Sequence, residues 1–378
     1  MQTATLATIY DELGVKPVIN ARGHNTVLGG STPSPRVKQA MENAERYYVD
    51  MQELLRRSGE MIADLLECEA AYVTSGAAAA LALGTAACLT GTDLGKMAQL
   101  PDTSGLKNRV LLQRRHHYAY QRAVTIVGTR LVDVGDEAGT TAAQLEAALT
   151  PEVATVLYPA HLEGTEGTLP LAEVIALAHR RGVPVLVDAA GRVYPLALFK
   201  SYTKLGADLV AFGAKYFGAP QSSGILCGTK ALVDAAVPQG FIGFETVANR
   251  QSFGRPFKLD RQEIIAVVVA LQEWMALDHG ARLAELERRL RAISDRLAGA
   301  PGVTTTLLRA DGPAARVLRI RIDSATGRRD LQSVVSELRA GSPAIAVGVD
   351  DGALYVNPAT VLNGDEAVIA DRLGRLLS

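Results

Sequence analysis

The segment DLVAFGAKYFG, residues 208–218, places a lysine just beyond a short apolar run. The run ends in small residues, which predicts a buried strand over Gly206–Phe212 followed by a turn. Lys215 lies in that turn among glycine, alanine and aromatic residues. A lysine in such a partly desolvated setting has a lowered pKa and can form an imine with an aldehyde. The alternative is a surface lysine whose aliphatic stem covers apolar neighbours.

A carboxylate precedes this lysine by 27 residues, in VLVDAAG (residues 185–191). Asp188 stands at the end of a predicted apolar strand, Val183–Asp188, where open α/β sheets bind their ligands. An anionic carboxylate there can pair with a protonated ring nitrogen. An aspartate that only begins a turn remains the alternative.

A third motif, VTSGAA at residues 73–78, joins a strand to a helix at small residues. Backbone N–H groups of Ser75, Gly76 and Ala77 would face an anion at the positive end of the helix. A plain serine cap is the alternative. With Asp188 and Lys215, however, this cup completes the set that a pyridoxal phosphate site needs: a phosphate cradle, a pyridinium partner and an imine-forming lysine.

Short apolar runs alternate with helical patterns through the middle of the chain. This alternation predicts βαβ units and a mostly parallel sheet covered on both faces, hence an α/β fold. Expected strands are Ala70–Thr74, Arg109–Gln113, Arg130–Val134, Val153–Tyr158, Val183–Asp188, Gly206–Phe212 and Gly224–Cys227; expected helices include Ala78–Leu89, Tyr118–Val127, Gln144–Leu149 and Leu171–Arg181.

The composition changes after about residue 255, where long charged helices precede short strands. We therefore expect a smaller C-terminal α+β domain. The predicted organisation is an N-terminal segment over residues 1–44 that packs with the small domain, a large cofactor-binding domain over 45–260, a connecting helix over 261–280 and the small domain over 281–378.

Composition excludes several classes of protein. The 378 residues are 48% hydrophobic and 21% charged, and 39 basic against 40 acidic residues leave a net charge of −1. This neutral balance argues against a nucleic-acid or membrane partner. Three scattered cysteines fit a reducing compartment, and no secretory leader is recognised, so a cytoplasmic protein is expected. His116 and His117 are adjacent, which is poor spacing for a metal site, and none is predicted.

The chain resembles fold-type I pyridoxal-phosphate enzymes, whose fold is that of aspartate aminotransferase. More narrowly, it resembles the group similar to bacterial selenocysteine synthase and D-glucosaminate-6-phosphate ammonia-lyase. The motifs that carry the resemblance are VINARG at 18–23, TSGA at 74–77, VDAA at 187–190, GAK at 213–215, GAPQSSG at 218–224 and GRPFK at 254–258.

The resemblance implies roles for single residues. Lys215 would form the Schiff base, Asp188 would pair with the pyridine nitrogen, and the segment Ser75, Gly76 and Ala77 would hold the phosphate with help from Gln221 and Ser222. His117 matches the segment in which related enzymes place a histidine over the cofactor ring, and it is expected to be catalytic.

Substrate contacts are expected from three further residues. Arg22 and Arg255 are candidates to bind a substrate carboxylate through the arginine fork, and His161 is a candidate acid or base. The segment LYVNPAT, residues 354–360, lacks the arginine that many transaminases keep there, which disfavours a standard aminotransferase. The family also implies a homodimer or higher homo-oligomer with shared active sites.

The predicted function is that of a lyase acting on a small amino acid or amino-sugar acid, by Cα deprotonation and α,β-elimination. Racemisation or epimerisation and aldol cleavage stay open, since all of them begin with removal of the same proton. Selenium transfer and transamination are less favoured. A binding module that keeps the fold without catalysis is the non-enzymatic alternative.

Overall fold

The computed structural model describes residues 8–246, 251–323 and 329–377, which fall into two compact units. The large unit is Ser31–Ala276, and the small unit combines Met1–Gly30 with Leu277–Ser378. Each has its own hydrophobic core.

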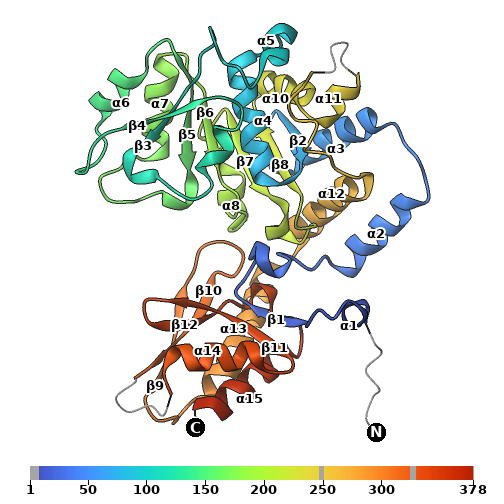
Figure 1. Cartoon of the computed structure of the whole chain (residues 1–378), viewed down its shortest axis with the longest axis vertical. Helices are drawn as coiled ribbons and strands as arrows, with labels where there is room; N and C mark the ends of the chain where they lie inside the picture. The colour runs from blue at the N-terminus through green and yellow to red at the C-terminus, as the bar shows by residue number, and fades with distance from the viewer. Residues whose placement is uncertain (1–7, 247–250, 324–328, 378) are drawn as a thin grey trace. The chain divides into compact units, whose positions relative to one another are not determined.

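A seven-stranded sheet forms the centre of the large unit (Figure 1). All of its strands are parallel except β8, which runs antiparallel to both neighbours, so the predicted mostly parallel sheet is confirmed. In spatial order the strands are β2 (Ala70–Thr74), β8 (Gly224–Gly228), β7 (Leu209–Gly213), β6 (Val185–Asp188), β5 (Val153–Pro159), β3 (Arg109–Gln113) and β4 (Arg130–Val134).

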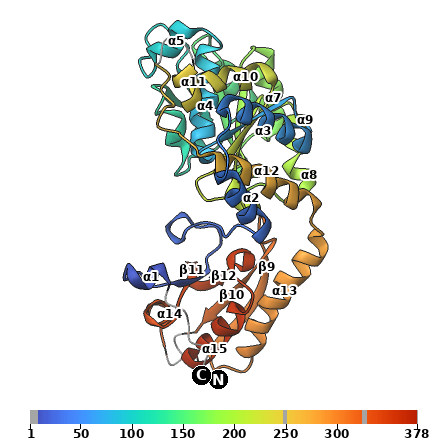
Figure 2. The ribbon, with the colours of Figure 1, turned by 90° about the vertical axis from the view of Figure 1, so that its right-hand side faces the viewer.

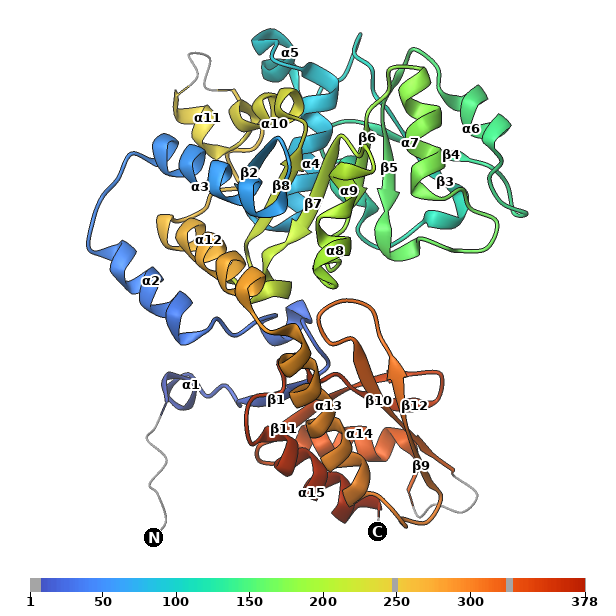
Figure 3. The ribbon, with the colours of Figure 1, turned by 180° about the vertical axis from the view of Figure 1, so that it is seen from behind.

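Strands β5 to β8 are buried along their whole length, because helices cover both faces of the sheet. Helix α4 (Gly76–Thr90) crosses one face, and α7 (Leu171–Arg180) and α9 (Ser201–Lys204) lie on the opposite one (Figure 3). Gly84 lets α4 approach closely, since a Cβ there would lie 3.2 Å from the Leu209 side chain.

The other α-helices of the large unit pack around this sheet or on one another. They are α2 (Pro35–Glu45), α3 (Met51–Leu66), α5 (Leu94–Gln99), α6 (Ala142–Ala148), α8 (Leu196–Phe199), α10 (Lys230–Ala236), α11 (Phe241–Thr246) and α12 (Arg261–Ala276).

The domain limits differ from those expected. Helices α2 and α12 pack together inside the large unit, joined by hydrogen bonds from Ser34 Oγ to Glu273 Oε2 (2.6 Å) and from Arg261 Nε to the Ala44 carbonyl (3.0 Å). Residues 31–44 therefore belong to the large unit, whereas they were predicted to pack with the small domain. The predicted connecting helix over 261–280 is two helices, and the first of them belongs to the large unit.

The predicted helix over Tyr118–Val127 is absent. That stretch contains only the short 3-10 helix η3 (Gln121–Val124), and a second, η2 (Arg114–His116), precedes it. The apolar side chains of this stretch enter the core from irregular backbone. Their spacing along the sequence resembles that of an amphipathic helix, although no α-helix forms.

The small unit has a five-stranded sheet in the order β1 (Val18–Ala21), β11 (Ala344–Asp350), β12 (Ala353–Val356), β10 (Arg316–Ile322) and β9 (Val303–Arg309), seen from a second side in Figure 2. Helices α13 (His279–Arg296), α14 (Leu331–Ala340) and α15 (Asp365–Leu377) accompany it, and α1 (Ile9–Glu12) precedes β1. The short 3-10 helices η1 (Thr26–Leu28) and η7 (Pro358–Thr360) complete the unit. Strand β1 pairs in parallel with β11, which ties the N-terminal segment to this unit.

Among the described residues, no single helix has both the length and the apolar composition needed to span a membrane; α12 and α13 meet that test only when counted together across the break between them.

Candidate active site

The candidate residues follow the carboxyl ends of strands β2, β5, β6 and β7, and the antiparallel strand β8 lies between β2 and β7. Strands β6 and β7 pair in parallel, with Asp188 opposite Ala211, so Asp188 and the turn after β7 share one edge of the sheet. Backbone hydrogen bonds from Ala189 N to Ala211 O and from Gly213 N to Ala190 O, each 3.0 Å, extend this pairing beyond the strands. Lys215 lies in the 3-10 helix η5 (Ala214–Phe217) that follows directly.

Lys215 is half-buried, and burial lowers the pKa of its amine. Its Nζ lies 5.3 Å from the centre of the Tyr216 ring. Two glycines make room for that ring: a Cβ on Gly213 would lie 3.1 Å from it, and one on Gly191 would lie 3.4 Å from it. A lowered pKa leaves a larger share of the amine neutral and nucleophilic.

Asp188 is only 5% exposed. Its Oδ2 accepts a 2.6 Å hydrogen bond from the Tyr118 hydroxyl, and its Oδ1 accepts one of 3.1 Å from the backbone N–H of Ala190. Burial raises the pKa of the Asp188 carboxyl, while both hydrogen bonds and the nearby His161 act to lower it. A buried carboxyl held in this way is suited to accept a further hydrogen bond from a positively charged donor, such as a pyridinium N–H.

His161 lies beside Tyr118, with ring centres 5.2 Å apart in an edge-to-face arrangement. It belongs to the 3-10 helix η4 (Ala160–Leu162), which follows β5 directly. Burial lowers the pKa of His161 below 6.5, and the charge of Arg192 adds to that effect, while Asp188 acts to raise it. The lowered pKa shifts the balance toward neutral imidazole and makes the protonated form a stronger acid, so the ring is able to exchange a proton.

The candidate phosphate cradle lies where β2 meets α4. Ser75 occupies the N-cap position of α4, but its side chain makes no capping hydrogen bond, so the plain-cap alternative does not hold. Gly76 has φ +87°, a left-handed conformation that favours glycine, and a Cβ there would lie 3.7 Å from the Ser222 carbonyl. The Ser75–Ala77 turn and the loop at residues 221–223 are thus neighbours.

The loop at residues 221–223 gives only partial support for phosphate binding. The Gln221 Oε1 atom is buried and has no hydrogen-bond partner among the described residues, but this oxygen accepts hydrogen bonds and therefore does not itself favour an anion. The Ser222 hydroxyl, in contrast, donates to Glu263 on α12, which is a different role from the one expected. The first-turn N–H groups of α4 and the Ser75 hydroxyl fit a phosphate group, to which Gln221 would contribute only through its amide N–H.

Three other predicted residues have partners elsewhere. His117 directs Nε2 to Asp133 at 2.7 Å and Nδ1 to Gln121 at 3.0 Å, on the exposed surface. Arg255 forms an ion pair with Glu245 at 3.2 Å. Arg22 belongs to the small unit, where it forms a β-bridge with Asn357. The imidazole that accompanies Asp188 is thus that of His161, whereas the sequence pattern pointed to His117.

Tyr118 was missed by the sequence reasoning. It stands next to His117 in RRHHYAY, residues 114–120, but its partner Asp188 is 70 residues away, and no spacing within one segment reveals such a pair. Its half-buried phenol has a pKa raised by burial and by the Asp188 charge, so the hydroxyl keeps its proton and acts as a donor.

Known proteins resemble the chain over nearly its whole length. A 5'-C-glycyluridine monooxygenase-decarboxylase from Streptomyces sp. is 33% identical over 97% of this chain and 92% of its own, and a D-glucosaminate-6-phosphate ammonia lyase from Salmonella typhimurium is 30% identical over 97% and 96%. An L-seryl-tRNA(Sec) selenium transferase from Moorella thermoacetica is 26% identical over 97% and 84%.

The solved structures agree. A structure of D-glucosaminate-6-phosphate ammonia-lyase superimposes with a TM-score of 0.85 at 28% identity and covers 99% of both chains. The predicted fold-type I architecture is confirmed, and the family implies pyridoxal 5'-phosphate as the cofactor. The family model for class-V aminotransferases matches residues 107–343, which include Asp188 and Lys215. The chain belongs to the class-V aminotransferase family.

Proposed function

We propose that this protein is a pyridoxal-phosphate-dependent lyase that releases ammonia from a small amino acid or amino-sugar acid by α,β-elimination. The observation that carries the proposal is the similarity to D-glucosaminate-6-phosphate ammonia lyase, which extends over the whole chain in both sequence and structure. In the overall reaction a 2-amino-3-hydroxy acid becomes a 2-keto-3-deoxy acid and ammonia, since the water lost in elimination returns in hydrolysis.

The cofactor would be held by Lys215 at its aldehyde carbon, by Asp188 at its ring nitrogen, and by Ser75, Gly76 and Ala77 at its phosphate. When bound, it supplies an electron-poor ring that stores the electron pair left on Cα. The buried position of Asp188 and its two hydrogen bonds favour a carboxylate that stays in one orientation toward such a ring.

Proton transfers would fall to two groups of this chain. The Lys215 amine, whose pKa burial lowers, takes the Cα proton in its neutral form. His161 donates a proton to the departing hydroxyl from its imidazolium form, which a lowered pKa makes a stronger acid, and is left as neutral imidazole; we propose it for this role in place of His117 because it lies with Tyr118 and Asp188. Arg22 and Arg255 remain proposed carboxylate ligands.

The test is a panel of amino-sugar acids and small hydroxy-amino acids incubated with the holoenzyme. Ammonia and 2-keto acid should appear in equal amounts, and Lys215→Ala should release neither. A Lys204→Ala variant, altered at an exposed lysine paired with Glu67, serves as the control and should keep full activity. Inverted stereochemistry without ammonia would show a racemase or epimerase, and aldehyde release would show an aldolase; either result would replace the proposal.

A second candidate is oxidative decarboxylation. The Streptomyces relative with 33% identity is named for monooxygenation and decarboxylation of 5'-C-glycyluridine. Both this name and that of the ammonia lyase denote substrates with an amino group beside a carboxylate, so the same site could serve either. Oxygen consumption with carbon dioxide release from a glycyl-nucleoside, in the absence of ammonia, would favour this candidate.

We further propose that the protein is a homodimer or larger homo-oligomer whose subunits share active sites. Tyr47, Tyr48 and Val49 form an exposed apolar segment between α2 and α3, with Tyr48 94% exposed, a surface suited to a partner subunit. Light scattering of the holoenzyme tests this, and a monomeric mass would contradict it.

A further inference from the structure

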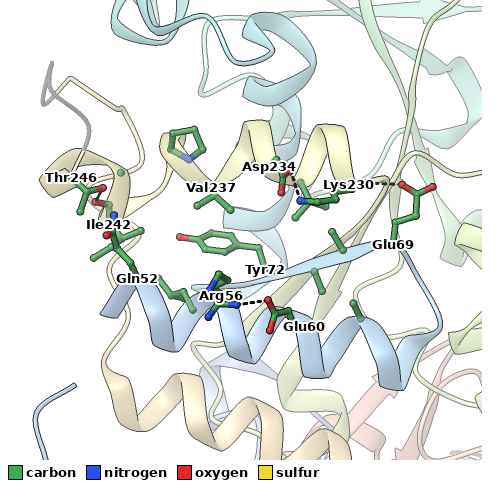
Figure 4. Close-up of a pocket in the computed structure, with 18 residues that line it drawn as sticks. Gln52, Arg56, Glu60, Glu69, Tyr72, Lys230, Asp234, Val237, Ile242 and Thr246 are labelled. Carbon is green, nitrogen blue, oxygen red and sulfur yellow. Dashed lines mark hydrogen bonds and ion pairs between the residues drawn. The ribbon is translucent and has the colours of Figure 1, made fainter. Parts of the chain in front are cut away.

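The large unit holds a pocket apart from the candidate active site, with a volume of about 560 Å³ (Figure 4). Its walls come from α3, the first residues of β2, α10 and α11. This volume lies within the range of small-molecule sites in proteins. The pocket shares no lining residue with the candidate active site, because it lies along the start of β2, whereas Ser75 follows the end of that strand.

Small side chains leave this space unfilled. Ala63, Ala70 and Ala71 line the pocket together with Gly59. A Cβ on Gly59 would lie only 2.2 Å from the Ala71 carbonyl oxygen, so α3 lies directly against the edge strand. Larger residues on the far side, among them Val233, Val237 and Ile242, make the remaining wall apolar.

Tyr72 supplies a buried polar group without a partner. Its side chain is 2% exposed, and its hydroxyl has no hydrogen-bond partner among the described residues. Figure 4 shows the ring lying along the pocket, between Val237 and Arg56, with the hydroxyl directed toward Ile242. A Cβ on Gly240 would come within 2.6 Å of this hydroxyl, so the backbone of Gly240 lies close beside it and leaves no room for a larger residue. An unsatisfied buried hydroxyl costs free energy that a ligand group can recover.

The charges around the pocket already have partners. Arg56 pairs with Glu60 at 2.5 Å and Lys230 with Asp234 at 2.6 Å, while Glu69 accepts the backbone N–H of Lys230 at 2.9 Å. Two cations against three carboxylates give this lining a net charge of −1, which disfavours an anionic ligand such as a phosphate or a carboxylate.

We propose that this pocket binds a neutral, largely apolar small molecule that carries one hydroxyl or carbonyl group, with that group hydrogen-bonded to Tyr72. The alanine and valine walls hold the apolar part. The hydroxyl of Tyr72 supplies orientation, because it can donate or accept.

The experiment uses the holoenzyme and three probes of similar size: p-cresol, toluene, which lacks the hydroxyl, and benzoate, which carries a charge. Dissociation constants come from NMR titration, and crystals soaked in p-cresol locate the site. We expect p-cresol in this pocket with its oxygen within hydrogen-bond distance of Tyr72, tighter binding of p-cresol than of toluene by about five-fold, and weaker binding of benzoate.

Two variants make the test specific. Tyr72→Phe should remove the preference for p-cresol over toluene without loss of thermal stability, since the deleted hydroxyl has no partner, and Ala70→Leu should fill the pocket and prevent binding of both. Tyr10→Phe, at an exposed tyrosine of the small unit, should bind like the unaltered protein. No density in the pocket at saturating p-cresol, an unchanged preference in Tyr72→Phe, or tighter binding of benzoate would each overturn the proposal.

Discussion

The Tyr118 hydroxyl donates a 2.6 Å hydrogen bond to Oδ2 of Asp188. This bond joins the loop after β3 to the end of β6 and opposes the rise in the carboxyl pKa that burial causes. Tyr118→Phe should therefore raise the Asp188 pKa further and weaken cofactor binding by about ten-fold. Spectral titration with pyridoxal 5'-phosphate measures the effect. Tyr120→Phe, at an exposed tyrosine two residues on, is the control. Equal cofactor affinities in the unaltered protein, Tyr118→Phe and Tyr120→Phe would show that Tyr118 does not position Asp188.

Asp188→Asn should have opposite effects on the apo and holo proteins. The folded-state pKa of this carboxyl is raised above 3.8, so its charged form destabilises the apo fold at neutral pH, and the amide should raise the apo melting temperature. The gain should vanish as the pH falls below 3.8, because the wild-type carboxyl is then protonated in both the folded and unfolded states. Cofactor affinity should fall by about 10- to 100-fold, because a charge-assisted bond is lost. Thermal scans of both forms across pH decide this, and a lower apo melting temperature would contradict it.

Lys215→Arg should abolish turnover, with a loss of about 10³-fold or more, because a guanidinium keeps its proton at every accessible pH. In the unaltered enzyme the rate should rise with pH and level off below the ordinary lysine pKa of 10.5, since burial lowers the pKa of Lys215. The pH profile of kcat checks this. A rise that is centred at or above 10.5 would show that the amine is not the titrating base.

The two histidines can be separated by matched substitutions. His161→Gln should reduce kcat by about 10- to 100-fold, because it removes the proton donor beside Tyr118. His117→Gln should leave kcat within about three-fold, because that ring bonds Asp133 and Gln121 at the surface and only an exposed pair is lost. A larger loss of kcat in His117→Gln than in His161→Gln would support the catalytic role predicted for His117 from the sequence.

Gly76→Ala tests the phosphate cradle against a control of equal backbone strain. Gly76 and Gly182 both have positive φ, +87° and +65°, so alanine at either should cost about 1–2 kcal/mol of stability. Only Gly76 borders the Ser222 loop, and we expect a lower cofactor affinity for Gly76→Ala alone. Denaturant unfolding and cofactor titration give the two quantities. An equal loss of cofactor affinity in Gly182→Ala would attribute the effect to general destabilisation.

The strands at the site could be predicted because they are buried on both faces. Val185–Asp188 and Leu209–Gly213 have continuous apolar runs, and parallel pairing then brings Asp188 and the turn of Lys215 to one edge. Periodicity failed over residues 118–127, where single apolar side chains enter the core from irregular backbone. It also gave no sign of β9, whose residues are mostly half-exposed. The partners of His117 and Tyr118 depend on contacts between distant segments, which no local pattern contains.

Strand β8 runs against its neighbours, and this direction determines how the reactive amine is placed. Gly213 pairs with Gly224, so the segment between them is a loop whose two ends are fixed to adjacent strands. The position of Lys215 within this closed loop depends on strand register more than on the packing of its own side chain. A lysine displaced by one residue along this loop would point its amine in a different direction. A relative with such a displacement would need a different β7–β8 connection to keep the same chemistry.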